Sequence, residues 1–173
     1  MTQAAPPPAN EKTRLEKLQQ LMVLDTPPEA LLDEITKLAS EVCGTPIALI
    51  SLIDEKRQWF KSNIGLEGVK ETQRNLAFCA HAILEDQIME VPDATLDKRF
   101  ASNPLVTGDP NIRFYAGAPL TLPSGENIGT MCVINHQPQT LTLYQKAMLL
   151  GLADIVVQTL TYRSTLLQQA AGD

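Results

Sequence analysis

The sequence predicts an α+β domain in which a central, mostly antiparallel sheet of five or six strands is covered by helices. Two hairpin patterns dominate the middle of the chain, and each consists of two apolar runs joined by a polar turn. Amphipathic helical patterns flank the hairpins at both ends, and a further helical segment lies between them. Because hairpins pair antiparallel, this order of elements indicates two or three packed layers.

The composition is that of one globular domain. The chain has 173 residues, of which 44% are hydrophobic and 20% charged, which is sufficient for a single core. We expect residues 1–10 to form a disordered tail, residues 11–168 one domain that includes both terminal helices, and residues 169–173 a second tail. The formal net charge of −6 argues against nucleic acid binding, which needs a dense basic surface.

Other features of the sequence indicate the compartment. The chain has no apolar run of about 18 residues, so no segment is expected to span a membrane. Its polar, proline-rich start lacks the basic and apolar regions of a secretory signal. Its three cysteines form no Cys-x-x-Cys pattern and do not suggest a disulfide framework. We therefore expect a cytoplasmic location.

Periodicity assigns the elements in order. Leucines recur at helical spacing over residues 10–24, and the Asp-Thr-Pro-Pro run that follows ends this helix. A second amphipathic helix covers residues 29–42, and Gly44 stops it. The further elements are a hairpin of strands 46–53 and 58–64, a helix from about Asn75, a short strand 88–91, an irregular stretch 92–108 with one helical turn near 97–100, a hairpin of strands 113–122 and 127–134, and a long helix 142–167.

Several short blocks, in order over about residues 14–160, together resemble the GAF domain family, in the subgroup found in bacterial signalling proteins. These blocks are LDTPPE (24–29), PIALISLID (46–54), RQWFKS (57–62), FCAHAI (78–83), VPDA (91–94) with RFASNPLV (99–106), IRFYAGAPL (112–120) and GTMCVI (129–134). Their combination in register is a strong signal, whereas each block alone is weak.

The resemblance implies that the terminal helices pack on one face of the sheet and that a pocket lies under the other face. It also implies a non-catalytic sensory module for a small molecule of unknown identity, without a known cofactor. In such domains, dimeric terminal helices pass the signal to a kinase, cyclase or phosphodiesterase. No such output domain follows in this sequence, so the chain is either a stand-alone protein acting on a partner in trans or a fragment of a longer one.

The candidate pocket residues come from four of these blocks, at residues 78–83, 91–106, 112–120 and 129–134, and include the single tryptophan. They are Trp59, Phe78, Cys79, His81, Asp93, Arg99, Arg113, Tyr115 and Cys132. Polar groups set among apolar ones suit a small-ligand pocket better than a reaction centre. In particular, Cys79 and His81 are two residues apart on a helix and point about 200° apart, so they do not form a nucleophile–base pair.

Strand alternation orders the block around Arg113. Arg113 and Tyr115 share one face of the strand, and Phe114 lies on the other with Ala116 and Ala118. The small alanines indicate the helix side, so Arg113 and Tyr115 are expected at the pocket or its rim. The structural alternative is that Arg113 forms an ion pair with Asp93 or Asp97. Asp93 and Arg99 would then anchor the loop that carries them. Trp59 has an alternative as well, as a half-buried sheet residue.

Other functions remain open at this point. Cys79 and Cys132 are able to approach one another in this fold, which would suit a GAF-type reductase of free methionine sulfoxide, although the surrounding residues do not match that family. A dimerisation scaffold without ligand is a third interpretation. A bilin-binding domain would normally have the histidine directly after the cysteine, and the cyclic-nucleotide signature is not found. A metal site, with Cys79, His81, Asp93, Cys132 and His136 as candidates, is not expected.

The terminal helices carry more apolar positions than one sheet face needs. These positions are Leu15, Leu18 and Met22 near the start and Ile155, Leu160, Leu166 and Leu167 near the end. A helix that extends beyond its domain commonly buries such a stripe against a partner. The sequence therefore predicts a homodimer.

Overall fold

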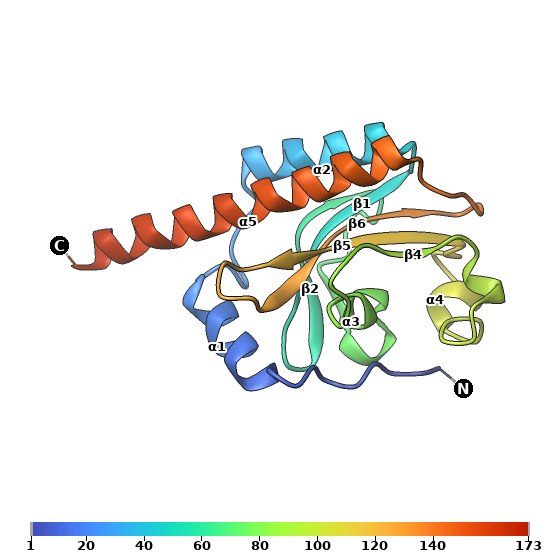
Figure 1. Cartoon of the computed structure of the whole chain (residues 1–173), viewed down its shortest axis with the longest axis horizontal. Coiled ribbons are helices and arrows are strands. Elements are labelled where there is room, and N and C mark those ends of the chain that lie inside the picture. The colour runs from blue at the N-terminus through green and yellow to red at the C-terminus, as the bar shows by residue number, and fades with distance from the viewer. Residues whose placement is uncertain (1, 173) are drawn as a thin grey trace.

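The computed structural model describes residues 2–172, and it confirms the α+β fold, with a six-stranded antiparallel sheet between helices (Figure 1). The helices are α1 (Glu11–Gln20), α2 (Ala30–Cys43), α3 (Phe78–Ala82), α4 (Pro104–Thr107) and α5 (Leu143–Gly172), with the 3-10 helices η1 (Arg74–Leu76) and η2 (Ala94–Leu96). The strands are β1 (Ile47–Ile53), β2 (Arg57–Ile64), β3 (Glu71–Gln73), β4 (Met89–Val91), β5 (Phe114–Thr121) and β6 (Asn127–Asn135).

The two hairpins form the centre of the sheet. The strand order is β3-β2-β1-β6-β5-β4, and every neighbouring pair is antiparallel. Pairing of β6 with β1 brings the second hairpin beside the first, so the segment between the hairpins has to cross over the sheet. That segment contains η1, α3, β4, η2 and α4.

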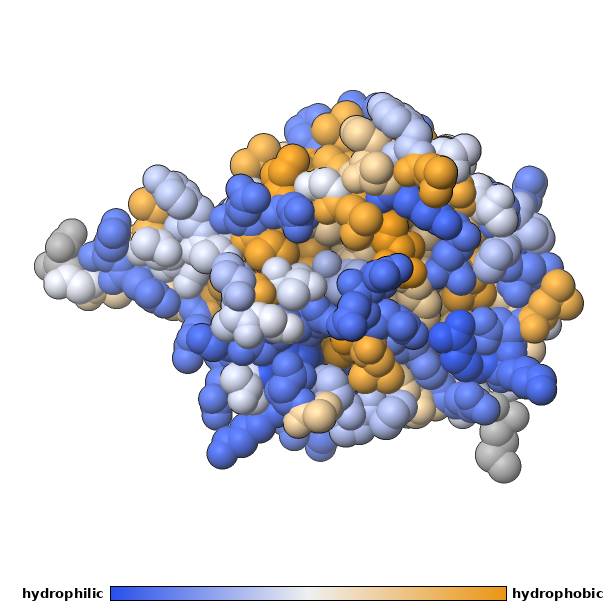
Figure 2. Space-filling model, viewed as in Figure 1, coloured by the Kyte–Doolittle hydropathy of each residue, from blue (hydrophilic) through white to orange (hydrophobic). Residues whose placement is uncertain are grey.

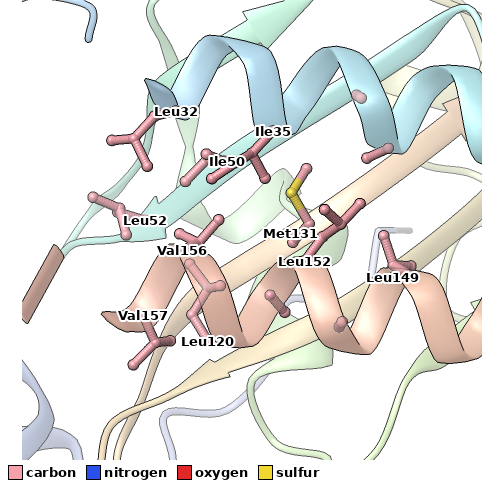
Figure 3. Close-up of a cluster of buried hydrophobic side chains, with 14 of the residues drawn as sticks. Leu32, Ile35, Ile50, Leu52, Leu120, Met131, Leu149, Leu152, Val156 and Val157 are labelled. Carbon is pink, nitrogen blue, oxygen red and sulfur yellow. The ribbon is translucent and has the colours of Figure 1, made fainter. Parts of the chain in front are cut away.

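The long helices α2 and α5 lie side by side on one face of the sheet (Figure 1). Their leucine, isoleucine and valine side chains point toward apolar side chains of β1, β5 and β6 (Figure 3). We call this cluster the helix-side core. Its labelled members in Figure 3 are Leu32, Ile35, Ile50, Leu52, Leu120, Met131, Leu149, Leu152, Val156 and Val157.

A second apolar cluster occupies the other face, where α3 and the crossover segment pack. We call it the cavity-side core. It includes Ile47, Leu49, Ile53, Phe60, Phe78, Met89, Phe100, Ile112, Tyr115, Cys132 and Ile134. Alternation along β5 separates the two cores as predicted: Phe114, Ala116 and Ala118 face the helices, and Tyr115 faces the crossover segment.

The structure corrects several boundaries. The edge strand β3 was not predicted, because its sequence Glu-Thr-Gln has no apolar alternation. The helical turn expected near residues 97–100 is present, because the Phe100 and Ala101 amides donate to the Asp97 carbonyl oxygen at 3.0 and 2.8 Å. The crossover also contains η2 and α4, which were not predicted, and the Asn103 side chain caps α4 by accepting a hydrogen bond from the Leu105 amide at 2.9 Å. Residues 2–8 form neither helix nor strand, and the Gln3 carbonyl contacts His81 at 2.9 Å.

The expected apolar stripe on the terminal helices also needs correction. Leu18 and Leu160 are fully buried in the helix-side core, so they are not available to a partner. The C-terminal part of α5 extends beyond the sheet (Figure 1). Ile155, Leu166 and Leu167 are exposed on α5. Within residues 2–172, no helix has both the length and the apolar character needed to cross a membrane.

One glycine is required by the close approach of the two hairpins. A Cβ atom on Gly129 of β6 would overlap the backbone carbonyl oxygen of Ser51 on β1. We expect Gly129→Ala to lower the free energy of unfolding by about 1–3 kcal/mol, since overpacking displaces backbone in both strands. Gly151→Ala is the matched control: Gly151 is exposed on α5 with open space around it, so the change should raise stability by about 1 kcal/mol. Urea unfolding of both variants measures the two shifts, and equal shifts would contradict the prediction.

Candidate functional site

A cavity of about 540 Å³ opens on the sheet face opposite α2 and α5. This volume lies in the range of small-molecule sites. Most of the lining side chains are apolar, so the cavity suits the apolar body of a ligand. The lining residues are Leu49, Gln58, Phe60, Gly65, Leu66, Glu67, Val69, Thr72, Phe78, Cys79, Leu105, Asp109, Pro110, Ile112, Tyr115, Ile134 and His136.

Polar groups meet at the inner end of the cavity, where the sulfur of Cys79 is the common acceptor. The Tyr115 hydroxyl donates a hydrogen bond to this sulfur at 3.1 Å, and the Thr130 hydroxyl donates another at 3.0 Å. The sulfur of Cys132 lies 3.9 Å from that of Cys79, and both cysteines are free thiols. We call these four residues the thiol centre.

Strand geometry explains how the thiol centre assembles. Thr130 and Cys132 are two residues apart on β6, so both side chains point toward the crossover segment. Gly117 on β5 pairs with Cys132, and a Cβ atom there would overlap the Tyr115 hydroxyl. This glycine therefore leaves the space that the Tyr115 ring needs. The short helix α3 then places Cys79 against both strands.

The pKa values of the two thiols are shifted in opposite directions. Burial by itself would raise the pKa of Cys79, but the hydrogen bonds from Cys132, Thr130 and Tyr115 outweigh it and lower this pKa to about 7. Burial raises the pKa of Cys132 well above its usual value, and the neighbouring Cys79 raises it further. Cys79 is therefore the thiol that ionises first.

Aromatic stacking fixes the position of α3. The Phe78 ring stacks on Phe100, with centroids 3.9 Å apart and an angle of 8° between the planes, and lies 5.3 Å from the Tyr115 ring. His81 packs edge-on against Phe100 at 4.9 Å. Its Nε2–H donates to the carbonyl of Gln3, and partial burial lowers the pKa of the imidazole. The crossover segment and the N-terminal residues are thus coupled to α3.

The rim of the cavity is acidic. Glu67 and Asp109 place exposed carboxylates there, and His136 adds an imidazole whose Nδ1 lies 2.7 Å from the Pro110 carbonyl oxygen. Among residues 2–172, no lysine or arginine lines the cavity. An anionic ligand would meet these carboxylates without a cationic partner, so the electrostatics favour a neutral or cationic molecule.

Four of the predicted pocket residues come together. Phe78, Cys79 and Tyr115 line the cavity, and Cys132 lies directly behind Cys79. His81 does not line it, because its position two residues after Cys79 on α3 points it toward Phe100 and Gln3.

The charged residues of the crossover segment have structural contacts. Asp93 caps η2 by accepting a hydrogen bond from the Thr95 amide at 3.0 Å. Arg99 forms an ion pair with Asp97 at 2.8 Å and lies over the Phe100 ring. The Arg113 guanidinium donates to the carbonyl oxygen of Val106 at 2.9 Å, which joins α4 to the start of β5, and neither Asp93 nor Asp97 forms an ion pair with it.

Trp59 is placed differently from the prediction. It lies opposite Leu52 in the β1–β2 pair and belongs to the helix-side core. The residues on either side of it along β2, Gln58 and Phe60, point into the cavity instead. Strand alternation therefore puts the tryptophan on the face away from the site.

Two polar residues of the site were not predicted. Thr130 donates to Cys79, and buried Gln58 lies in a chain of hydrogen bonds that runs from Ser51 through its amide to Thr72. The signal for Thr130 was the period of two on β6, which puts it on the same face as Cys132. Residues 2–172 contain no group of three or more His, Cys, Asp or Glu side chains arranged to hold a metal ion.

An antiparallel sheet with helices on one face and a cavity on the other defines the class of α+β domain that the resemblance implied. The chain belongs to the GAF domain family, whose model matches residues 27–160. It is therefore a GAF-type signalling module. The match includes both hairpins, the crossover segment, all of α2 and the first part of α5, up to residue 160.

A relative contains a similar region within a longer protein. The chain is 46% identical over 165 residues to the cyclic di-GMP phosphodiesterase PA2567 of Pseudomonas aeruginosa. The match covers 94% of this chain but only 28% of the length of that relative. The matched region is thus a minor part of the phosphodiesterase.

Solved structures share the fold at low identity. The GAF domain of the Acinetobacter phosphoenolpyruvate-protein phosphotransferase has a TM-score of 0.65 at 17% identity, over 89% of this chain and 94% of that one. The type II free methionine-R-sulfoxide reductase of Thermoplasma acidophilum has a TM-score of 0.61 at 16% identity, over 76% and 90%. These similarities establish the fold alone.

Proposed function

We propose that this chain is a non-catalytic sensory module that binds a neutral or cationic, largely apolar small molecule in the cavity and relays its presence through dimeric terminal helices. The single observation that carries the proposal is an apolar cavity with an acidic rim, lined by the sheet, by residues 65–72 after β2 and by the crossover segment. The free, buried thiols are consistent with a reducing, cytoplasmic location.

The relay would run through the sheet. The cavity walls include the loops around α4, whereas the other side of β5 and β6 packs against α5. A ligand that binds one arrangement of the crossover segment more tightly shifts the population toward it. Because the interior is closely packed, a shift of β5 or β6 would be passed to α5.

The effector is proposed from the relative. The Pseudomonas aeruginosa protein is named a cyclic di-GMP phosphodiesterase, and the matched region is 28% of it. We propose that this module regulates an enzyme of cyclic di-GMP turnover, in the same chain or in trans. The acidic rim argues against the dinucleotide itself as the cavity ligand, since phosphate recognition commonly uses arginine or lysine.

A pair of dyes tests the ligand class. N-phenyl-1-naphthylamine is neutral, and 1-anilinonaphthalene-8-sulfonate has the same ring system with one negative charge. We expect the neutral dye to bind and the sulfonate to bind at least about tenfold more weakly, a difference of about 1.4 kcal/mol. Fluorescence titration measures both affinities, and native mass spectrometry of the purified chain detects any retained natural ligand.

Matched variants locate the bound dye. Leu105→Trp fills the cavity from α4, and we expect it to weaken binding of the neutral dye by about tenfold or more. Leu96→Trp adds the same ring at an exposed position of the same segment and should leave binding unchanged. Equal affinity for the two dyes, or binding that Leu105→Trp does not affect, would contradict the proposed site. A cavity that binds neither dye in a dimeric chain would favour the scaffold interpretation.

The second candidate is a thiol reductase for free methionine sulfoxide. The 3.9 Å separation of the Cys79 and Cys132 sulfurs favours it. The chain with dithiothreitol and free methionine sulfoxide would then release methionine, and Cys79→Ala would abolish the release while Cys43→Ala would not. Absence of methionine formation by the unmodified chain would exclude this candidate.

A further inference from the structure

The two thiols of the thiol centre differ in a way that suits a two-step oxidation. Cys79 lines the cavity, and two hydroxyl donors contact its sulfur. Cys132 is fully buried, does not line the cavity and lies behind Cys79 at 3.9 Å. A molecule that enters the cavity therefore meets Cys79 first, and Cys132 is the next sulfur within reach.

We propose that Cys79 and Cys132 form a hydroperoxide-reactive site, in which Cys79 is oxidised first and Cys132 then closes an intramolecular disulfide. Oxidation of the two thiols is a different event from reversible ligand binding. The dye experiments can therefore fail while the thiol experiments succeed, and the reverse. Reactive thiols have thiolate character and are within reach of a reagent. Two hydroxyl donors favour the thiolate of Cys79, and this residue, although only 2% exposed, is part of the cavity wall, through which a hydroperoxide would reach it.

The reaction balances without a further reagent. The Cys79 thiolate attacks the terminal oxygen of ROOH, so that an S–O bond forms, the O–O bond breaks and ROH leaves with a proton. Cys79 is then a sulfenic acid. The Cys132 sulfur attacks the Cys79 sulfur, so that the S–S bond forms, the S–O bond breaks and water leaves. Overall, two thiols lose two electrons and two protons, and the hydroperoxide is reduced to ROH and water.

Closing the disulfide would move α3. The sulfurs need to approach by a further ~1.9 Å to reach bonding distance. Cys132 is on the central strand β6, whereas Cys79 is on a five-residue helix, so α3 is the element free to shift. Phe78 stacks on Phe100 of the crossover segment, so this movement would alter the cavity wall and reach the same relay as a ligand.

The third cysteine provides an internal control. Cys43 lies at the end of α2 in the helix-side core, and burial raises its pKa to about 11. It does not line the cavity. In the folded protein, Cys43 should therefore remain reduced while the other two cysteines react.

Peptide mapping tests the site. The reduced chain is treated with hydrogen peroxide or with cumene hydroperoxide, then denatured, alkylated and digested without reductant. We expect loss of two thiols per chain and a linked peptide pair containing Cys79 and Cys132, with Cys43 alkylated. Faster reaction with cumene hydroperoxide would identify organic hydroperoxides as the preferred source, because the cavity walls are apolar.

Variants assign the order of the two steps. Cys132→Ser should leave a sulfenic acid on Cys79 that dimedone traps, whereas Cys79→Ser should leave Cys132 unreactive. Tyr115→Phe removes one donor to the Cys79 sulfur and should slow oxidation several-fold at pH 6, because loss of this hydrogen bond raises the pKa of Cys79 and leaves less thiolate. The fluorescence of buried Trp59 checks that each variant is folded. Oxidation of Cys43 as fast as Cys79 in the unmodified chain, or no linked peptide, would overturn the proposal.

Discussion

Replacing Glu11 with alanine is expected to lower the free energy of unfolding by about 3–4 kcal/mol, a large effect for a partly exposed residue. Both carboxylate oxygens of Glu11 accept hydrogen bonds from the Arg14 guanidinium, each at 2.9 Å. Arg14 is fully buried and also donates to the Ile53 carbonyl at 2.7 Å. Arg74 forms a second ion pair with the same carboxylate. Removal of Glu11 would leave a buried cation and its neighbour without the carboxylate that neutralises them.

The network formed by Glu11, Arg14 and Arg74 links the start of the chain to the site. Arg14 on α1 contacts the end of β1 through the Ile53 carbonyl, and Arg74 opens η1, which leads directly into α3. Loss of Glu11 should therefore loosen the segment that carries Cys79 as well as destabilise the whole domain.

The same network predicts a loss of stability in acid. Partial burial would raise the pKa of Glu11, but the hydrogen bonds and charges of Arg14 and Arg74 outweigh it and lower this pKa from 4.5 to about 2. A carboxyl group with a lowered pKa in the folded state stabilises that state above its unfolded pKa. The contribution, about 3 kcal/mol, should be complete above pH 5 and should disappear as the pH falls toward 2.

Urea unfolding at pH 7 and at pH 3 measures both effects. Glu16→Ala is the matched control, because Glu16 is exposed on the same helix and should change stability by less than about 0.5 kcal/mol. The difference between Glu11→Ala and the unmodified chain should be smaller at pH 3 than at pH 7. Equal stabilities of the two alanine variants at pH 7 would show that the buried arginine does not depend on Glu11.

The central sheet could be predicted because its pattern is local. The continuous apolar run of β1 and the alternation of Phe114 and Tyr115 on β5 identify buried strands and their faces. The edge strand β3 lacked such a pattern. It forms because the backbone of β2 offers it hydrogen bonds, which depends on the folded sheet and not on its own residues.

The site was predictable only in part, for the same reason. Cys79 and Tyr115 were found because polar groups within apolar blocks are visible in sequence. Arg113 and Arg99 were visible in the same way, yet they anchor loops, because which carbonyl or carboxylate they reach depends on the tertiary fold. The approach of Cys132 to Cys79, over 53 residues of sequence, follows from strand order and not from spacing.

The outer side of α5 carries a stripe that the domain itself does not cover. Ile155, Thr159, Tyr162 and Leu166 recur at alternating spacings of four and three residues, which is the seam pattern of paired helices. Ile155, Tyr162 and Leu166 have exposed fractions of 47%, 68% and 53%. In Figure 2 the end of this helix that extends past the sheet in Figure 1 is mostly hydrophilic with isolated hydrophobic residues, and a larger hydrophobic area lies nearer the body of the molecule. A second copy of the chain is the partner that we propose for this stripe.

Other residues of the same helix fill the core, so the stripe is not needed there. Leu149, Leu152, Val156 and Leu160 are buried against the sheet and α2, on a side of α5 roughly a quarter of a turn around the helix from the stripe. The stripe also borders a groove of about 740 Å³ between α5 and the start of α2, where Leu31 is exposed. Two such surfaces related by a twofold axis would contact each other with the same residues.

Leu166→Asp is therefore expected to weaken dimerisation by about 100-fold or more. The substitution removes one buried leucine from each protomer, about 1.5 kcal/mol for each, which is about 3 kcal/mol for the dimer. It should leave the fold intact, because Leu166 is exposed and does not belong to the helix-side core. Sedimentation equilibrium over micromolar concentrations measures the dissociation constant.

Leu143→Asp is the matched control for this prediction. Leu143 begins α5, is 86% exposed and lies outside the stripe, so the same substitution should not change the dissociation constant. An acidic residue at the start of a helix is also compatible with the helix dipole, which keeps the control folded. A chain that is monomeric at tens of micromolar, or equal weakening by both substitutions, would refute the dimer along α5. If Leu166→Asp gives a folded monomer that still binds the neutral dye, then binding and relay are separable, and only the relay requires the paired helices.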